Sequence, residues 1–340
     1  MKSQVIKTLL ISGIFISQIL VSYGQNSQEK DNIQKAQEEA YNNTKNITEG
    51  KNANYIPYLA NVPSDLFGIV MVTTEGKIYK IGNSDFEFGI ESISKIFVLA
   101  LAMQTIDPDT IQKNIGVNAT GMPFNSVIAI ELEGKSPISP IVNAGAMATN
   151  SLIKGITKEE QFDKILKYFS KIANRPLRVI SELYQSEAAT NMHNRAIAML
   201  LASYGHMWSD PLDACDSYTK QCSVGITAED LAMMGSFLAN GGIHPITKER
   251  LLKEEYVPKV LAVMSMEGLY QNTGDWMYTV GLPAKSGVGG GILAIVPGKM
   301  AIAVFAPPLD EAGNSVKAQK AIACIAQKLG FNIYKVNTKQ

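Results

Sequence analysis

The order of strand and helix patterns constrains the fold most strongly, because strands are expected at both ends of the chain and helices between them. Residues 67–72 and 76–79 flank a Thr-Glu-Gly turn and predict a β-hairpin. Residues 289–296 and 300–306 form a second apolar pair around a Pro-Gly turn. A single sheet built from both ends, with a helical subdomain inserted at about residues 105–265, fits this order.

Helical patterns fill the middle of the chain and return once at its end. The segment that begins at Thr227 has an N-cap with acidic first-turn residues, and Asn240-Gly-Gly is a stop signal after it. The expected helices span residues 141–153, 158–173, 186–204, 227–239 and 315–329.

The N-terminus has the pattern of a secretory signal peptide. Lys2 and Lys7 precede an apolar stretch at residues 9–21, and small residues precede Gln25. We expect a signal peptide at residues 1–24 and a periplasmic or secreted protein. The alternative, an uncleaved anchor, is disfavoured because a span needs about 20 apolar residues. Residues 25–50 are expected to be a polar linker or surface helix, followed by a catalytic domain at 51–335.

Composition excludes several classes of function. The formal net charge is zero, which argues against a nucleic-acid partner or, once the signal peptide is removed, a membrane partner. The three histidines and three cysteines have no metal-ligand spacing, so no metal is expected. No GxGxxG or P-loop motif is present, and the serine chemistry described below needs no organic cofactor. A Cys215–Cys222 disulfide is left open, because the sequence does not show the geometry of the pair.

Ser92-Ile-Ser-Lys95 stands at the head of the apolar run 96–103, which predicts a buried helix. Residues three apart share one face of a helical turn, so a desolvated Lys95 can act as the base for Ser92. This Ser-x-x-Lys spacing is typical of serine acyl-transfer enzymes. It also occurs at Ser27, Ser151 and Ser217, and the alternative is an ordinary capped helix with a solvated lysine.

Lys285-Ser286-Gly287 strengthens the enzyme interpretation. It precedes a glycine-rich strand, where Ser-x-x-Lys enzymes carry a Lys-(Ser/Thr)-Gly element beside the nucleophile. A strand edge there can offer a backbone N–H to an oxyanion, together with the N–H of Ser92.

Several further motifs follow one another along the chain. In chain order, with the two above, they are Ser92-Ile-Ser-Lys95, Pro140-Ile-Val-Asn143-Ala-Gly-Ala, Ser186-Glu187 with Asn194, Leu212-Asp213 with Tyr218, Gln221-Cys222-Ser223, Leu238-Ala-Asn-Gly-Gly242 and Pro283-Ala-Lys-Ser-Gly-Val288. With these motifs the chain resembles the serine-dependent glutaminases from about residue 55 to residue 305.

The resemblance implies an α/β (α+β) fold of the β-lactamase and penicillin-binding-protein type, with an antiparallel sheet, and hydrolysis of L-glutamine to L-glutamate and ammonia. It implies Ser92 as nucleophile, Lys95 as base, and a homodimer or homotetramer. His193 stands where the family is expected to carry arginine. The implied substrate-contacting residues, besides Ser92, are Tyr55, Asn143, Glu187, Asn194, Tyr218, Tyr270 and Val288.

These residue types suit a free amino acid. A buried carboxylate such as Glu187 can pair with an α-ammonium, and amides and phenols can bind the α-carboxylate. Tyr270 or Tyr218 is expected to help protonate the departing ammonia. Two alternatives remain: a β-lactamase or penicillin-binding-type enzyme, although no Ser-Asp-Asn motif is present, and a non-catalytic amino-acid-binding protein on the same fold.

Overall fold

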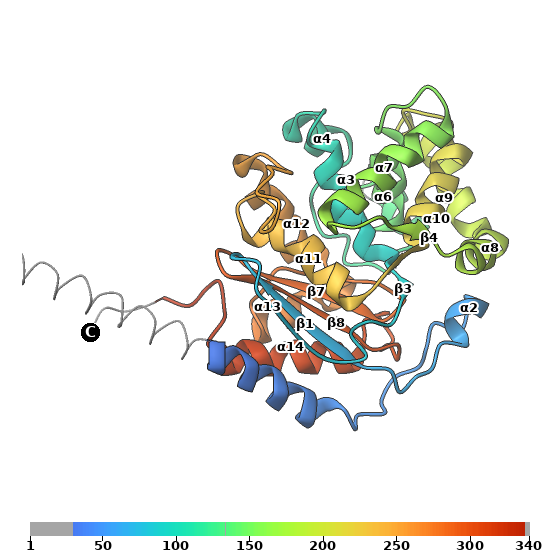
Figure 1. The fold of residues 1–340 in the computed structure, drawn as a ribbon. Helices are drawn as coiled ribbons and strands as arrows, with labels where there is room; N and C mark the ends of the chain where they lie inside the picture. The colour runs from blue at the N-terminus through green and yellow to red at the C-terminus, as the bar shows by residue number, and fades with distance from the viewer. Residues whose placement is uncertain (1–29, 133, 337–340) are drawn as a thin grey trace, which may run out of the picture.

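The sheet joins the two ends of the chain, as the sequence predicts. The computed structural model describes residues 30–132 and 134–336, so the expected signal peptide at residues 1–24 lies outside the described residues. Five antiparallel strands run in the order β2-β1-β8-β7-β6 (Figure 1). Their bounds are β1 Gly68–Thr73, β2 Ile78–Gly82, β6 Ala284–Ser286, β7 Gly291–Val296 and β8 Met300–Phe305.

The central pairing is between β1 and β8, which are distant in sequence. Gly68 is paired with Phe305 at one end, and Thr73 with Met300 at the other. Both strands are buried along their whole length, since helices cover both faces of the sheet. The antiparallel sheet built from both chain ends is therefore confirmed.

One face of the sheet is covered by helices from the two termini. Residues 30–44 are helical and lie beside α14 (Val316–Leu329) along this face (Figure 1). Ile33 and Ala40 share an apolar cluster with Ile322 and Ile325 of α14 and with the strand side chains on this face of the sheet. The polar stretch near the N-terminus thus contributes an apolar helix face to the core.

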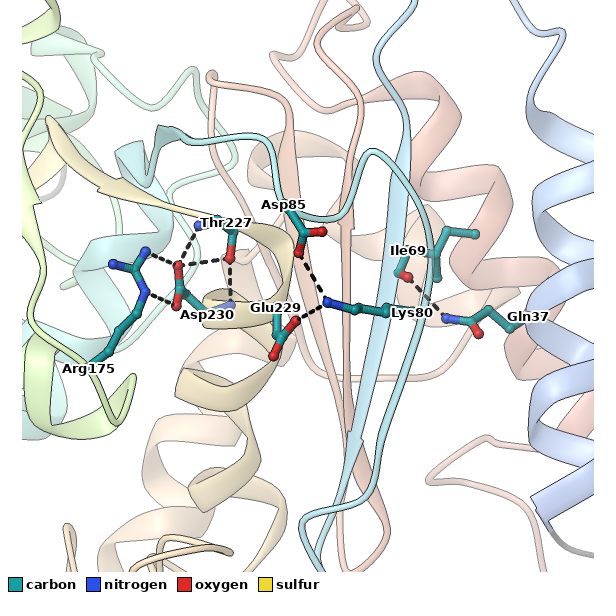
Figure 2. A network of polar contacts seen from close by, with 8 residues as sticks. All are labelled: Gln37, Ile69, Lys80, Asp85, Arg175, Thr227, Glu229 and Asp230. Atoms are coloured by element: carbon teal, nitrogen blue, oxygen red, sulfur yellow. Dashed lines mark hydrogen bonds and ion pairs between the residues drawn. The ribbon is translucent and has the colours of Figure 1, made fainter.

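The opposite face is covered first by α11 (Ala228–Ala239). Its N-terminus carries a reciprocal capping box between Thr227 and Asp230. Arg175 binds both carboxylate oxygens of Asp230, with Nε to Oδ1 2.6 Å (Figure 2). Nearby, Lys80 of β2 contacts Glu229 at 2.9 Å. These contacts fix the direction in which α11 crosses the sheet.

Beyond α11 lies a group of helices with a small three-stranded sheet. The strands are β3 (Phe88–Gly89), β4 (Arg178–Val179) and β5 (Val224–Ile226), in the order β3-β5-β4. The helices are α3 Ser94–Ala102, α4 Pro108–Asn114, α5 Val127–Leu132, α6 Asn143–Ser151, α7 Lys158–Ile172, α8 Ser181–Thr190, α9 Met192–Ser203, α10 Pro211–Cys222 and α12 Val257–Glu267.

The single helix expected at residues 186–204 is wrong. Two helices, α8 and α9, meet at Asn191, which has φ −89° and ψ 18° and leaves the helical path. The Asn191 amide donates to the Thr219 hydroxyl at 3.2 Å. Asparagine side chains compete with helical backbone bonding, which favours a break at this position.

The three cysteines are free thiols. Cys215 and Cys222 lie seven residues apart on α10, which separates them by about 10 Å along the helix axis. A disulfide needs Cα atoms within about 7 Å, so this pair cannot close. Among the described residues, no helix combines the length and the apolar character that a membrane span requires.

Candidate active site

Ser92 and Lys95 lie where the sheet meets the helical group. Ser92 is in a 3₁₀ turn, η1 (Glu91–Ile93), and α3 begins at Ser94, so the expected helix start at Ser92 is wrong by two residues. The turn and helix are continuous, and both side chains are buried, with 6% of Ser92 and 1% of Lys95 exposed. The alternative of a capping serine with a solvated lysine is therefore wrong.

The Lys95 ammonium is buried and makes a short hydrogen bond. Its Nζ donates to Asn143 Oδ1 at 2.7 Å and lies 5.6 Å from the Tyr218 ring centre. Burial lowers the pKa of Lys95 to about 8, although nearby Cys222 and Glu267 act in the opposite direction. A lysine with this pKa exchanges its proton near neutral pH, as a general base must.

Asn143, at the start of α6, connects three helices around Lys95. Its Oδ1 also accepts the Tyr218 hydroxyl at 3.0 Å, and its Nδ2 donates to Asn194 Oδ1 at 3.0 Å. A Cβ at Gly145 would lie 1.7 Å from the Ser139 carbonyl, so glycine is required for α6 to approach this closely. The structure thereby brings together Asn143, Asn194 and Tyr218, which the resemblance grouped.

The Tyr270 hydroxyl lies beside the Ser92 hydroxyl. Tyr270 lies in η3 (Tyr270–Asn272) with φ 54°, a strained value for a tyrosine. Burial raises the pKa of its hydroxyl, and interactions with the Ser92 and Ser286 hydroxyls partly offset that rise. Among the described residues, no group hydrogen-bonds the Tyr270 hydroxyl with normal geometry. This phenol is therefore positioned beside Ser92 and retains a free proton.

Lys285 is a second buried lysine. Its Nζ lies 4.1 Å from the Tyr270 ring centre and donates to the carbonyls of Gly268 and Ser286 at 3.2 and 2.8 Å. Burial lowers its pKa well below that of a free lysine, and the charge of Lys95 adds to the effect. Because its contacts are backbone carbonyls and a ring, it braces β6 against Tyr270.

The segment after β6 passes directly over the Ser92 turn. A Cβ at Gly287 would lie 2.9 Å from the Ile90 carbonyl, and one at Gly289 would lie 2.6 Å from the Gly89 carbonyl. Both glycines are therefore needed for this approach. Val288 lies between them, and no described residue accepts a hydrogen bond from its N–H. That N–H is available beside Ser92.

Glu187 lies inside α8 and not at a helix start. It lies close to Glu91 and Cys222, neither of which was predicted from the sequence as a site residue. Glu91, Glu187 and Cys222 place one oxygen or sulfur atom each within 4.8 Å of one another. Burial raises the pKa of both Glu91 and Glu187. The only sequence signal for Glu91 is its place next to Ser92. The proximity of Lys95 opposes a metal cation in this cluster.

Tyr55 closes the site from the solvent side. The residue is 54% exposed, but burial of its hydroxyl raises its pKa, and Glu91 and Tyr270 add to the rise. Its ring borders a surface cavity of about 740 Å³, which Phe124 also lines. Phe124 packs on Tyr270 with ring centres 4.9 Å apart. His193 lies farther out, where its Nε2 contacts the Asn125 carbonyl at 2.8 Å.

Comparison with known proteins decides the family. The sequence model of the glutaminase family matches residues 50–334. The chain belongs to the glutaminase family. A glutaminase of Brucella canis is 53% identical over 92% of this chain and 99% of its own. Glutaminase 1 of Shigella flexneri is 50% identical over 90% of this chain and 99% of its own.

Solved structures agree with this glutaminase assignment. A probable glutaminase superposes with a TM-score of 0.89 at 50% identity, covering 90% of this chain and 99% of that one. The crystal structure of Mglu in its glutamate form gives a TM-score of 0.83 at 35% identity, covering 88% of this chain and 69% of that one. The expected family, fold class and enzyme class are confirmed.

Proposed function

We propose that this glutaminase hydrolyses L-glutamine to L-glutamate and ammonia through a γ-glutamyl ester on Ser92. The observation that carries the proposal is the burial of Lys95 three residues from Ser92, which lowers the pKa of Lys95 to about 8. A neutral amine at that position can accept the serine proton.

The proton transfers of acylation and deacylation can be assigned to named residues. Neutral Lys95 takes the Ser92 proton as Oγ attacks the side-chain carboxamide carbon. The C–N bond breaks, and the proton passes to the departing ammonia from Lys95 through Tyr270 or Tyr218, whose hydroxyls border the same pocket. Lys95 then takes a proton from a water molecule whose oxygen attacks the ester carbon. The ester C–O bond breaks, Lys95 passes the proton from water to Ser92 Oγ, and L-glutamate is released.

The oxyanion is placed at the backbone N–H groups of Ser92 and Val288. The unpartnered N–H of Val288 and the close approach of its glycine neighbours to residues 89–91 support this placement. Preorganised donors of this kind typically contribute about 10²–10³-fold in rate.

Different residues bind the two charged groups of L-glutamine. Glu187 receives the α-ammonium, because it is the carboxylate of the pocket nearest the protein surface. Asn194, Asn143 and Tyr55 bind the α-carboxylate through neutral donors. A ligand lacking either group leaves polar atoms of the pocket, including those of the buried Asn143, without partners, which disfavours its binding.

The test is ammonia and glutamate release by the wild type, Ser92→Ala and Lys95→Ala. Each variant is expected to lose several orders of magnitude in kcat, on the order of 10⁴-fold or more. Ser217→Ala is the matched control, because Ser217 and Lys220 have the same spacing elsewhere in the fold. Wild-type turnover in Ser92→Ala contradicts the covalent route. Acylation of Ser92 by a penicillin, with no ammonia from glutamine, favours the β-lactamase alternative.

We also propose export and self-association. The basic and apolar pattern of residues 1–24 supports cleavage before Gln25, and the resemblance supports a homodimer or homotetramer. Mass measurement of the periplasmic or secreted protein tests the first proposal, and light scattering of that protein tests the second. A cytoplasmic protein that retains Met1, or a monomer at assay concentration, contradicts them.

A further inference from the structure

The residue before the nucleophile, Glu91, has an unexplained carboxyl group. Its side chain is 3% exposed, and its Oε1 has no hydrogen-bond partner among the described residues. An unpaired buried carboxylate is costly, and a group in that position either loses its charge or gains a partner. The backbone is also strained, with φ 51° at a non-glycine residue.

Three glycines make the space that Glu91 occupies. A Cβ at Gly89 would lie 3.2 Å from its Oε1, and Cβ atoms at Gly287 and Gly289 would lie 3.1 Å from its Cβ and Cγ. These glycines belong to β3 and to the loop after β6, and the two segments touch, since a Cβ at Gly289 would lie 2.6 Å from the Gly89 carbonyl. The carboxyl group is therefore held in one place by the same loops that shape the catalytic turn.

The neighbour that completes the arrangement is Glu187. Oxygen atoms of Glu91 and Glu187 lie within 4.8 Å of each other, with Glu91 buried and Glu187 partly buried. Two carboxylates this close in such surroundings do not both ionise readily. The titratable groups that face Glu91 from the surrounding elements are Glu187 of α8, Lys95 of α3, Cys222 of α10, Tyr55 and Tyr270.

We propose that Glu91 is the protonated member of a buried acid–carboxylate pair and donates its O–H to Glu187. Glu187 is then the single anion of the pair and keeps the charge that receives the substrate's α-ammonium. Glu91 is a positioning residue, since it acts through Glu187. This inference rests on the proposed role of Glu187 in substrate binding.

The direction of the charge shifts agrees with this assignment. Burial raises the pKa of Glu91 first, and the Glu187 charge raises it further. Burial also raises the pKa of Glu187, but the hydrogen bond with Glu91 lowers it in part. Removal of that donor therefore raises the pKa of Glu187. As the pH is lowered, Glu187 then becomes protonated, and ammonium binding is lost, at a higher pH than in the wild type.

The test measures binding of L-glutamate, which carries the same α-ammonium, by calorimetry in a Ser92→Ala background. Glu91→Leu keeps the volume and removes the donor, so a larger fraction of Glu187 is protonated. Kd at pH 6, below the Glu187 pKa of about 7, is then expected to rise about tenfold. The acidic limb of the Kd–pH profile moves to higher pH. Glu91→Gln keeps a donor and is expected to restore Kd to within about threefold. Thermal unfolding of each variant checks that it is folded.

Two results overturn the inference. If Glu91→Gln binds as weakly as Glu91→Leu, Glu91 acts as a second anion and not as a donor. If Glu91→Leu binds like its parent, the pair does not control the site. Infrared spectra give an independent readout at pH 8, where Glu187 with its pKa of about 7 is mostly ionised. A protonated-carboxyl band is expected there with Glu91 and not with Glu91→Gln. Binding in the Ser92→Ala background does not depend on turnover, so failure of the proposed reaction is seen separately as absence of ammonia from the wild type.

Discussion

At the scale of single residues, the reactivity of the site depends on how dry the surroundings of Lys95 are. Asn143 is the closest polar partner of its Nζ, and the rings of Tyr218 and Tyr270 complete the enclosure. Burial disfavours the ammonium form, which makes the neutral base available at ordinary pH. Without this enclosure, a lysine near its usual pKa of about 10.4 would be almost fully protonated.

This enclosure predicts the pH dependence of turnover. The required form of Lys95 is neutral, so its fraction falls as pH decreases below its pKa of about 8. We expect kcat/KM to fall at least about tenfold per pH unit below that value and to level off above it. Lys95→Arg should stay protonated at every accessible pH and remain inactive. A flat wild-type profile between pH 6 and pH 9 would contradict Lys95 as the base.

The sequence identified much of the site but not its electrostatics. Ser92 and Lys95 are recognisable because their spacing is local and Lys285-Ser286-Gly287 supports it. Glu91 was missed because its partner, Glu187, lies 96 positions away in the chain. Burial and pairing depend on which distant segments pack together, and no local pattern records that packing.

At the scale of elements, short segments place the reactive groups more directly than the long helices do. Ser92 lies in a 3₁₀ turn, Tyr270 in another, and Val288 in the loop between β6 and β7. Helix positions with clear end signals, such as Thr227 and Asn240, were predicted to within a residue. The break at Asn191 was not predicted, because the apolar pattern continues across it.

Gly287 gives an element-scale prediction. An added methyl group in Gly287→Ala meets the Ile90 carbonyl at 2.9 Å and displaces the Val288 N–H from the Ser92 turn. We expect kcat to fall about 100-fold, the cost of a displacement of about 1 Å at a reacting centre. Gly274→Ala is the control, because its Cβ meets nothing within 4 Å and no activity change is expected. Equal activities of both variants would show that the position of the loop between β6 and β7 does not affect catalysis.

At the scale of the whole molecule, the sheet ties the ends of the chain together and supports the site from one side. β1 and β8 pair at its centre, while α14 and residues 30–44 seal the face opposite the helical group (Figure 1). The order of strand and helix patterns was enough to predict this topology. The part played by residues 30–44 was harder to predict, because only a few apolar positions interrupt their polar sequence.

A core substitution on the sealed face separates stability from chemistry. Ile322 is fully buried against the sheet, so Ile322→Ala should lower the free energy of unfolding by about 2–5 kcal/mol. The kcat of the folded variant should stay near the wild-type value, because the site lies on the other face. Denaturant unfolding followed by circular dichroism, with kcat measured beside it, checks both parts. A stable variant with impaired kcat would contradict this separation.

The covalent γ-glutamyl ester on Ser92 can be trapped during turnover. Rapid acid quenching of the wild-type reaction with L-glutamine, followed by peptide mass spectrometry, detects it. We expect a γ-glutamyl mass increase on the peptide containing Ser92, absent in Ser92→Ala. An activated γ-ester of glutamate controls for deacylation that is faster than the quench, because it forms the same acyl-enzyme more rapidly while the deacylation step is unchanged. Turnover of that ester with no adduct on Ser92, or with an adduct on another residue, would exclude the γ-glutamyl ester on Ser92.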